Sequence, residues 1–232
     1  MIGVAIPAHN EEAHLGACLA ALLAAARDPA LHGEAVSVLV VLDACDDGSE
    51  AVVRTCQPAF AAAGVALDCI AVNERRVGAA RAAGARHLLA LGARWLAFTD
   101  ADTRVSPQWL AAQLALDADV VCGSVAVDDW SPHAGRAEAM RAHFDGSYQD
   151  RDGHRHIHGA NLGVSAAAYQ AAGGFESVPC HEDVLLVRAL EGIGARFAWS
   201  ARPRVFTSAR TDARARDGFG DTLLRMLDAS QA

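Results

Sequence analysis

The chain contains no lysine, and all 20 of its basic side chains are arginines. Its 28 acidic residues leave a formal net charge of -8, which argues against nucleic acid as the main partner, because phosphate backbones need a basic surface. Long apolar runs are also missing, since the longest, Leu15–Ala26, is too short to span a bilayer. The first residues lack the basic and then apolar pattern of a secretion signal. We therefore expect a cytoplasmic protein without a membrane span.

Cysteine is sparse and scattered. The six thiols show neither the close pairs of a zinc site nor the spacing of a compact disulfide framework, so we expect reduced cysteines and no cysteine nucleophile. By contrast, hydrophobic residues make up 52 % of the chain and charged residues 21 %, which is typical of a globular protein with a full core.

Short apolar runs alternate with helical patterns in the first half of the chain. Strands are expected at residues 2–6, 36–42, 66–72, 95–99 and 120–127, and helices at 10–26, 49–63, 77–91 and 107–116. Asn10 and Ser106 are the expected N-caps of the first and last of these helices. This repeated order predicts an α/β fold with a mixed, mainly parallel sheet flanked by helices.

The second half is less regular. Strands are expected at residues 159–165 and, as sheet edges, at 196–200 and 204–206; helices are expected at 134–144, 166–172, 181–190 and 219–227. No linker separates the two halves, so we expect a single domain over residues 1–232.

Two aspartates one residue apart, Asp100 and Asp102, end the fourth apolar run. Alternate side chains of a strand share a face, so the two carboxylates can converge and would repel each other unless a cation lies between them. Mg²⁺ and Mn²⁺ prefer such carboxylate oxygens. Further acids follow the other predicted strands, at the edge where ligands of parallel sheets bind. The alternative interpretation is a solvated turn with an aspartate cap.

Six short motifs occur in an order that resembles the family 2 glycosyltransferases of the GT-A fold, which bind nucleotide sugars. They are residues 6–12 (IPAHNEE), 40–49 (VVLDACDDGS), 78–84 (GAARAAG), 100–102 (DAD), 173–175 (GGF) and 181–186 (HEDVLL). The resemblance implies a Rossmann-like GT-A domain. Residues 1–127 would form the nucleotide-sugar-binding half, and residues 128–232 would supply the acceptor site and the catalytic base.

The resemblance also implies roles for individual residues. The expected donor-binding residues are Pro7, Ala8, Glu11, Asp43, Arg81 and Asp100. Of these, Glu11 would lie near the ribose or base, Asp43 would contact the base, and Arg81 would lie near the diphosphate. Asp102 would ligate Mn²⁺ or Mg²⁺ directly, with Asp100 on the ribose or on a metal-bound water. Alternatively, Glu11 and its neighbour Glu12 stabilise a helix N-terminus, and Asp43 belongs to a turn. Asp46 and Asp47 are interpreted as turn and cap residues.

The implied reaction is an inverting transfer from a nucleotide diphosphate sugar, with a UDP-sugar favoured as the commonest donor of the family. Asp183 would be the general base that takes the proton of the attacking acceptor hydroxyl. Further acceptor or diphosphate contacts are expected from His158, Asn161, His181 and Glu182. The sequence does not distinguish a small-molecule acceptor from a glycan or a lipid-linked one.

Two features depart from the family pattern. Ala44 and Cys45 lengthen the turn after the second strand, and the arginine-rich acceptor motif often found near the C-terminus is missing, which argues against a processive polysaccharide synthase. One rival function is a nucleotidyltransferase of related fold, which would require a glycine-rich basic loop where residues 7–11 are acidic. The other is a non-catalytic nucleotide-sugar-binding protein, against which the retained Asp100, Asp102 and Asp183 argue.

Three histidines, His154, His156 and His158, alternate along the chain. On a strand they would share one face and could bind zinc or nickel. Their polar flanks favour instead a mobile loop over the active site, whose removal would leave folding intact. A third interpretation is that His156 or His158 faces the donor or acceptor sugar.

The last part of the chain is rich in arginine, with Arg202, Arg204, Arg210 and Arg214 close together. This cluster is interpreted either as a basic tail that closes on the diphosphate or as ordinary solvated surface.

Overall fold

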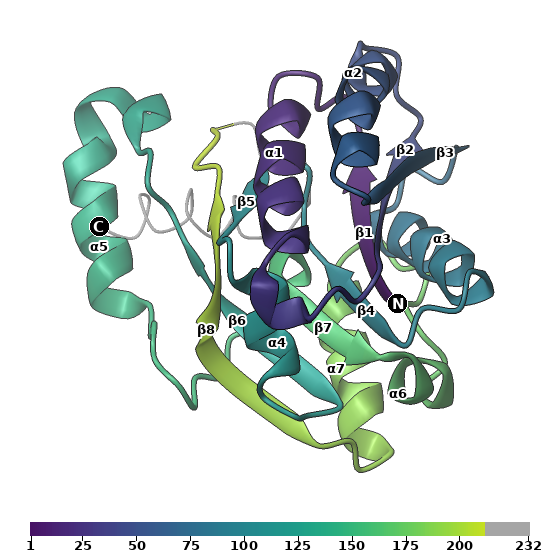
Figure 1. Cartoon of the computed structure of the whole chain (residues 1–232). Helices are drawn as coiled ribbons and strands as arrows, with labels where there is room; N and C mark the ends of the chain where they lie inside the picture. Colours follow the sequence, from purple (N-terminus) through teal and green to yellow (C-terminus); the bar gives the residue numbers. More distant parts are fainter. Residues whose placement is uncertain (212–232) are drawn as a thin grey trace.

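The structure is a computed structural model and describes residues 1–211. Its centre is an eight-stranded sheet with the order β3-β2-β1-β4-β7-β6-β8-β5 (Figure 1). The strands are β1 (Ile2–Ala8), β2 (Val36–Asp43), β3 (Ala66–Val72), β4 (Trp95–Phe98), β5 (Thr103–Val105), β6 (Val120–Ala126), β7 (Leu162–Ser165) and β8 (Phe197–Thr207). Only β7 and β5 run against the others in this part of the chain. The expected mixed, mainly parallel sheet is confirmed.

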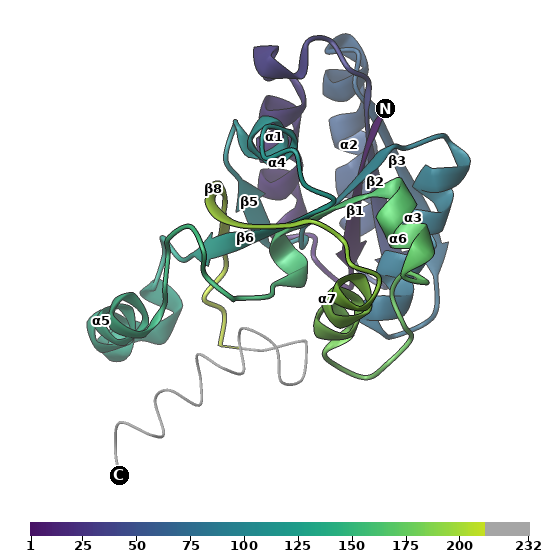
Figure 2. The ribbon, with the colours of Figure 1, turned by 90° about the horizontal axis from the view of Figure 1, so that it is seen from below.

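Helices cover both faces of the sheet. They are α1 (Leu15–Ala26), α2 (Ser49–Ala62), α3 (Val77–Ala90), α4 (Trp109–Leu114), α5 (Ala137–Ser147), α6 (Ala166–Ala171) and α7 (Glu182–Gly192), with short 3₁₀ turns η1 (Pro29–Leu31), η2 (Ser131–Arg136) and η3 (Gly159–Asn161). In Figure 2, α1, α2 and α4 lie on one face and α3, α6 and α7 on the other, while α5 stands clear of the sheet. None of the helices within residues 1–211 has both the length and the apolar character needed to cross a membrane.

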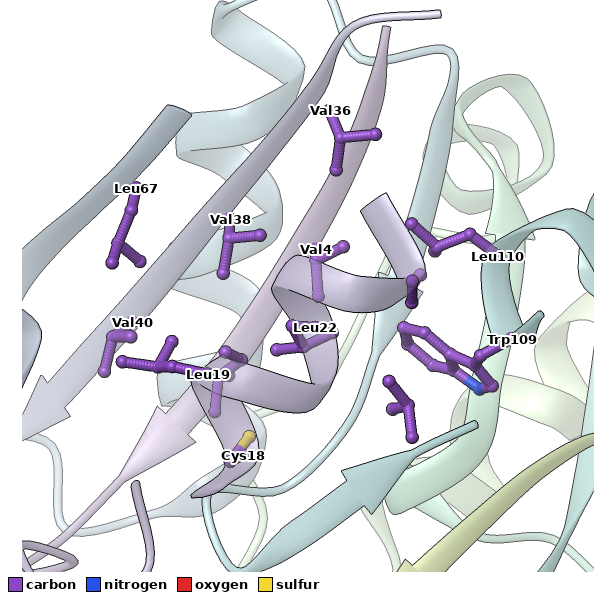
Figure 3. Close-up of a cluster of buried hydrophobic side chains, with 14 of the residues drawn as sticks. Val4, Cys18, Leu19, Leu22, Val36, Val38, Val40, Leu67, Trp109 and Leu110 are labelled. Carbon is purple, nitrogen blue, oxygen red and sulfur yellow. The ribbon is translucent and has the colours of Figure 1, made fainter. Parts of the chain in front are cut away.

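The alternation of side chains along the central strands builds two cores. Val4 of β1 and Val38 of β2 pack on the α1 side, whereas Ala5, the next residue of β1, packs on the α3 side. Figure 3 shows Leu19 and Leu22 of α1 in the first of these cores. Because both faces of β1 and β2 are covered, their sequences are continuous apolar runs rather than alternating ones.

The start of α1 differs from the expectation. The helix begins at Leu15 rather than at residue 10, so the interpretation of Asn10 as its N-cap is wrong. Asn10 has a left-handed backbone (φ 55°), and its amide group is used elsewhere. It donates to Asp46 Oδ1 over 2.6 Å and accepts from the Asp46 backbone N–H over 2.9 Å. A contact with a distant loop has therefore replaced the local cap.

The bounds of several other helices and strands also differ from those expected from the sequence. The helix expected at 107–116 is reduced to α4, and Ser106 makes no side-chain cap there. The two expected edge strands form one strand, β8, which lies inside the sheet between β6 and the unforeseen short strand β5. The segment expected as a strand at 159–165 starts with η3, and α5 starts at Ala137 after η2. The expected helix at 219–227 lies outside the described residues.

Candidate active site

The carboxyl ends of β1, β2 and β4 meet at one edge of the sheet, as their parallel pairing requires. The loops that follow these strands carry most of the expected site residues. Pro7 and Ala8 are the last two residues of β1, with Ala8 buried and Pro7 half-buried. Pro7 is tolerated in this central strand because the pairing of β1 with β4 already ends at Ala5.

The loops after β1 and β2 hold each other through a row of hydrogen bonds. Besides the paired contacts of Asn10 and Asp46, the Glu12 N–H donates to Asp47 Oδ2 over 3.0 Å, and Glu12 Oε2 accepts from the Gly48 N–H over 2.7 Å. Asp47 Oδ1 also accepts from the N–H of Ser49 at the start of α2. Asp46 and Asp47 are thus the turn and cap residues that the sequence indicated, and Glu12 also has a structural use.

Asp43, at the end of β2, fixes the turn that leads into α3. Its Oδ1 accepts from the backbone N–H groups of Glu74 and Arg75 over 2.8 and 2.9 Å, and its Oδ2 accepts from that of Arg76 over 3.1 Å. The side chain is buried. Three backbone bonds to one carboxylate are a structural role that the sequence did not reveal, because residues 74–76 are distant in the chain.

Arg81 of α3 lies at the centre of a buried charge cluster. Its guanidinium donates to Asp100 Oδ1 over 2.5 Å and to Glu182 Oε1 of α7, and the residue is only 3 % exposed. Burial alone would lower the pKa of Arg81, but the Asp100 and Glu182 carboxylates raise it above its ordinary value. Arg81 is therefore permanently charged, and it joins Asp100 to the start of α7.

Two glycines make room for the Arg81 cluster. A Cβ on Gly78 would lie 2.5 Å from the Glu176 carbonyl oxygen, so α3 could not approach the start of α7 as closely. A Cβ on Gly159 would lie 2.5 Å from the guanidinium of Arg81. The glycine that opens residues 78–84 is thus explained by close packing.

Asp183, the expected base, directly follows Glu182 at the start of α7. Its Oδ2 accepts from the Gly159 backbone N–H over 2.8 Å, which orients the carboxylate. Asp183 is only partly buried, unlike Glu182. Burial raises the pKa of Glu182 above its usual range, against the opposing effect of Arg81. His181, just before them, is exposed and has a left-handed backbone (φ 63°).

A second arginine connects the remaining two acids. Arg210 donates to both carboxylate oxygens of Glu11, over 2.9 and 2.7 Å, and its Nη2 lies 2.8 Å from Asp102 Oδ2. Burial raises the pKa of Asp102, and Arg210 opposes this increase. The sequence included Arg210 only as one member of an arginine-rich tail. Arg202 of that tail is exposed, Arg204 pairs with Asp150, and Arg214 lies outside the described residues.

The acids at this edge suit a divalent cation that is shared with a substrate. Within residues 1–211, no three His, Cys, Asp or Glu side chains form a group that could hold a metal by themselves. However, Arg81 and Arg210 are surrounded by five carboxylates, those of Glu11, Asp100, Asp102, Glu182 and Asp183. Carboxylate oxygens are the ligands that Mg²⁺ and Mn²⁺ prefer, and both metals commonly take their remaining ligands from phosphates and water. The residues present therefore fit such an ion at Asp102.

The three alternating histidines lie in a segment without helix or strand, as the loop interpretation expected, but their rings are packed against neighbouring side chains. His154 is fully buried, and the ring of Tyr148 stacks on His156 with centroids 4.1 Å apart. His158 Nε2 lies 2.9 Å from the Tyr148 hydroxyl, and burial together with the neighbouring histidines lowers the pKa of His158 to about 3. The rings stack in a row instead of converging, and the described residues contain no metal-binding histidine group.

Asn161 is fully buried, which does not fit the expected contact with an acceptor. Its Nδ2 donates to the carbonyl oxygens of Ser124 and Pro203 over 2.7 and 2.5 Å, and its Oδ1 accepts from Trp109 Nε1 over 2.8 Å. These bonds tie β6, β8 and α4 together. Asn161 is therefore a structural residue beneath the site.

The sequence of the chain matches the family model described as glycosyl transferase family 2 over residues 3–172. The chain belongs to this family. No curated protein matches it. The family 2 assignment agrees with the order of the strands and with the acids at their carboxyl ends.

Solved structures with a similar fold have low sequence identity to this chain. TarS 1-349 from S. aureus is 14 % identical, with a TM-score of 0.65 over 90 % of this chain and 60 % of its own. The mannosyltransferase PcManGT from Pyrobaculum calidifontis, in complex with GDP-Man and Mn²⁺, is 20 % identical, with a TM-score of 0.64 over 92 % of this chain and 58 % of its own.

Glucosyl-3-phosphoglycerate synthase from Mycobacterium tuberculosis, in complex with Mn²⁺, UDP and glucosyl-3-phosphoglycerate, is 18 % identical, with a TM-score of 0.54 over 97 % of this chain and 79 % of its own. The family 2 chain thus has the GT-A fold. It spans 60 % or less of the TarS and PcManGT chains.

Proposed function

We propose that the protein is a metal-dependent inverting glycosyltransferase that moves a sugar from a nucleotide diphosphate donor, with a UDP-sugar favoured, to an acceptor hydroxyl. One observation carries the proposal. The buried contacts from Asp100 through Arg81 to Glu182 hold the Asp-x-Asp motif next to Asp183. Two of the residues expected to bind the donor, Asp100 and Arg81, are thereby linked to Glu182, the sequence neighbour of the expected base.

The charge of the site supports a requirement for a metal. Five carboxylates against two guanidinium groups would repel a diphosphate, so donor binding needs additional positive charge. Asp102 would hold Mn²⁺ or Mg²⁺, with Asp100 beside it, and the ion would supply positive charge to the leaving diphosphate. Two of the similar structures contain Mn²⁺, one with GDP-Man and one with UDP.

The proposed chemistry needs one positioned base. Asp183 accepts the proton of the acceptor hydroxyl as that oxygen attacks the anomeric carbon from the face opposite the diphosphate. The hydrogen bond from the Gly159 N–H to Asp183 Oδ2 keeps the carboxylate in one orientation. A double-displacement mechanism would need a nucleophile and a separate acid/base group instead.

The rest of the donor site follows from the same edge of the sheet. Pro7, Ala8 and Glu11 line the nucleotide pocket, and Asp43 at the end of β2 lies on the base side. Because Asp43 already fixes the backbone of residues 74–76, its contact with the base would use the remaining lone pairs of the carboxylate. His158, His181 and Glu182 surround Asp183 as candidate contacts for the acceptor or the diphosphate.

The proposal is tested by calorimetric titration of UDP and GDP into the protein, with and without Mn²⁺. We expect binding of one nucleotide to depend on Mn²⁺, and Asp102→Asn to weaken that binding at least about tenfold, because the direct metal ligand is lost. Asp128→Asn is the matched control, since Asp128 is exposed and pairs only with Arg104 among the contacts in residues 1–211.

An unchanged titration in Asp102→Asn would refute the metal assignment. Transfer itself is measured as release of the nucleoside diphosphate from the matching nucleotide sugar. Metal-dependent binding without any such release, with a panel of acceptors, would favour a non-catalytic nucleotide-sugar-binding protein.

A further inference from the structure

Arg210 lies shortly after the end of β8. Its guanidinium contacts two acids, Glu11 and Asp102, at the edge of the sheet where the donor is proposed to bind. It forms two hydrogen bonds with Glu11, and its Nη2 is 2.8 Å from Asp102 Oδ2. The three side chains are only 12 %, 10 % and 19 % exposed. Such paired, partly desolvated contacts are stronger than ordinary surface ion pairs.

Both ends of this contact are anchored. Ala209, next to Arg210, is 1 % exposed and packs against Trp130, Met140 and Phe144 on the α5 side of the molecule. On the other side, the Glu11 N–H donates to Ser49 Oγ at the start of α2. The contact joins residues that are 199 positions apart, and the fold itself maintains it.

The guanidinium occupies Oδ2, one of the two Asp102 oxygens that a metal could use. A divalent ion ligated by Asp102 would lie about 2.0–2.2 Å from a carboxylate oxygen. A guanidinium nitrogen hydrogen-bonded to the same oxygen would then face a like charge at short range. The two cations therefore compete for Asp102 Oδ2.

We propose that Arg210 is an exchangeable counter-ion of Asp102, which the divalent metal must displace from this carboxylate. The inference rests on the metal-binding part of the proposed function. In the donor-free protein, Arg210 neutralises the carboxylates of Glu11 and Asp102 and disfavours a bare metal ion. A metal that arrives with a diphosphate brings further ligands and offers the displaced guanidinium new acceptor oxygens. Arg210 thus favours loading of the metal together with the donor over loading of the metal alone.

The test is a titration of Mn²⁺ alone, without nucleotide, followed by the electron paramagnetic resonance signal of the free ion. Arg210→Gln should bind Mn²⁺ about tenfold more tightly than the wild type, since a charge-assisted contact no longer competes. Arg202→Gln removes the same charge from an exposed position of β8 and should bind Mn²⁺ like the wild type. The double variant with Asp102→Asn should lose the gain.

Equal Mn²⁺ affinity in the wild type and in Arg210→Gln would overturn the exchange, whatever nucleotide the protein uses. A gain that persists in the double variant would place the new metal elsewhere and also overturn it. If neither protein binds Mn²⁺ without nucleotide, the exchange is overturned, whereas the metal assignment stands or falls with the separate titration of nucleotide in the presence of Mn²⁺. Should Arg210→Gln not fold, Arg210→Lys decides the question, because a lysine reaches only one of the two carboxylates and should raise the Mn²⁺ affinity severalfold.

Discussion

Two arginines each bridge two acids of the candidate site, but they do so in different surroundings. Arg81 joins Asp100 to Glu182 from the middle of α3 and is only 3 % exposed. Arg210 joins Glu11 to Asp102 from the segment after β8, with a side chain that is 12 % exposed. The Arg81 cluster lies between α3 and the start of α7. The Arg210 cluster lies beside the loop after β1, at the edge of the sheet where the donor is proposed to bind.

The difference separates the two aspartates of the Asp-x-Asp motif. Asp100, whose side chain is 34 % exposed, pairs with the buried Arg81, and removal of that arginine would leave the buried carboxylate of Glu182 without its counter-ion. Asp102 belongs to the Arg210 cluster, where a metal ion could take over the role of the arginine. We therefore expect two residues separated by a single position, Asp100 and Asp102, to differ in role, the first as an anchor and the second as the proposed site of exchange.

The largest expected effect comes from removing the fixed arginine. Arg81→Met should lower the free energy of unfolding by about 3–5 kcal/mol, because Glu182 and Asp100 lose the cation that compensates them. Urea denaturation measures the loss. The corresponding change at the second arginine, Arg210→Met, should cost less, about 1–2 kcal/mol, because the side chain of Arg210 is 12 % exposed against 4 % for Arg81.

The pH dependence sharpens this prediction. Burial raises the pKa of Glu182 in the folded protein, so the folded state binds more protons than the unfolded state as the pH falls toward 5. Part of the stability lost in Arg81→Met should therefore return on acidification and disappear again as the pH rises. Equal decreases in the free energy of unfolding in Arg81→Met and Arg210→Met would contradict the distinction between a fixed cluster and an exchangeable one.

The second prediction concerns Asp183, the proposed base, which directly follows Glu182 in the sequence. Asp183→Asn should lower kcat by about 10²- to 10⁴-fold and leave the affinity for the donor nearly unchanged, because the proton transfer occurs only in the transition state. Steady-state kinetics and a donor titration measure the two quantities. A large loss of donor affinity with normal kcat would instead assign Asp183 to the donor site on the Asp102 side of the comparison.

The sequence predicted the parts of this molecule that depend on local pattern. The boundaries of β3 match the expectation because its apolar run lies between Gly64 and the polar residues 73–76. The acids at the carboxyl ends of β1, β2 and β4 were expected at one edge, since parallel pairing permits no other arrangement. The family followed from motif order, which is also a property of the sequence.

Contacts between distant segments could not be predicted in the same way. Asparagine is a residue type favoured at N-caps, but the side-chain amide of Asn10 pairs with Asp46 in the loop after β2. The bridge from Arg210 to Glu11 spans almost the whole chain, and no spacing rule connects the two. The polar flanks of the histidines correctly suggested a loop, but they did not reveal that Tyr148 packs against His156 and His158. In each case a contact with another segment of the chain, which the local sequence does not encode, determined where the side chain lies.

The last prediction tests whether the buried part of the site around Arg81 extends to the row of histidines. His158 directly precedes Gly159, which holds Asp183 and makes room for Arg81. The pKa of His158 is about 3 in the folded protein, against an ordinary value of 6.5. As the pH falls below 6.5, the unfolded state therefore binds more protons at this residue than the folded state does. The stability contributed by neutral His158 is present above pH 6.5 and is lost on the way to pH 3.

His158→Gln retains a polar partner for Tyr148 but cannot take up this proton. Between pH 6 and 4, the stability of the wild type should therefore fall relative to that of the variant by up to about 1.4 kcal/mol per pH unit. Urea denaturation over this range measures the difference, and His143→Gln on the exposed face of α5 serves as the control. If the stabilities of the wild type and His158→Gln remain parallel, His158 exchanges protons with solvent in the fold. The histidine row would then resemble the more exposed surroundings of Arg210 rather than the buried surroundings of Arg81.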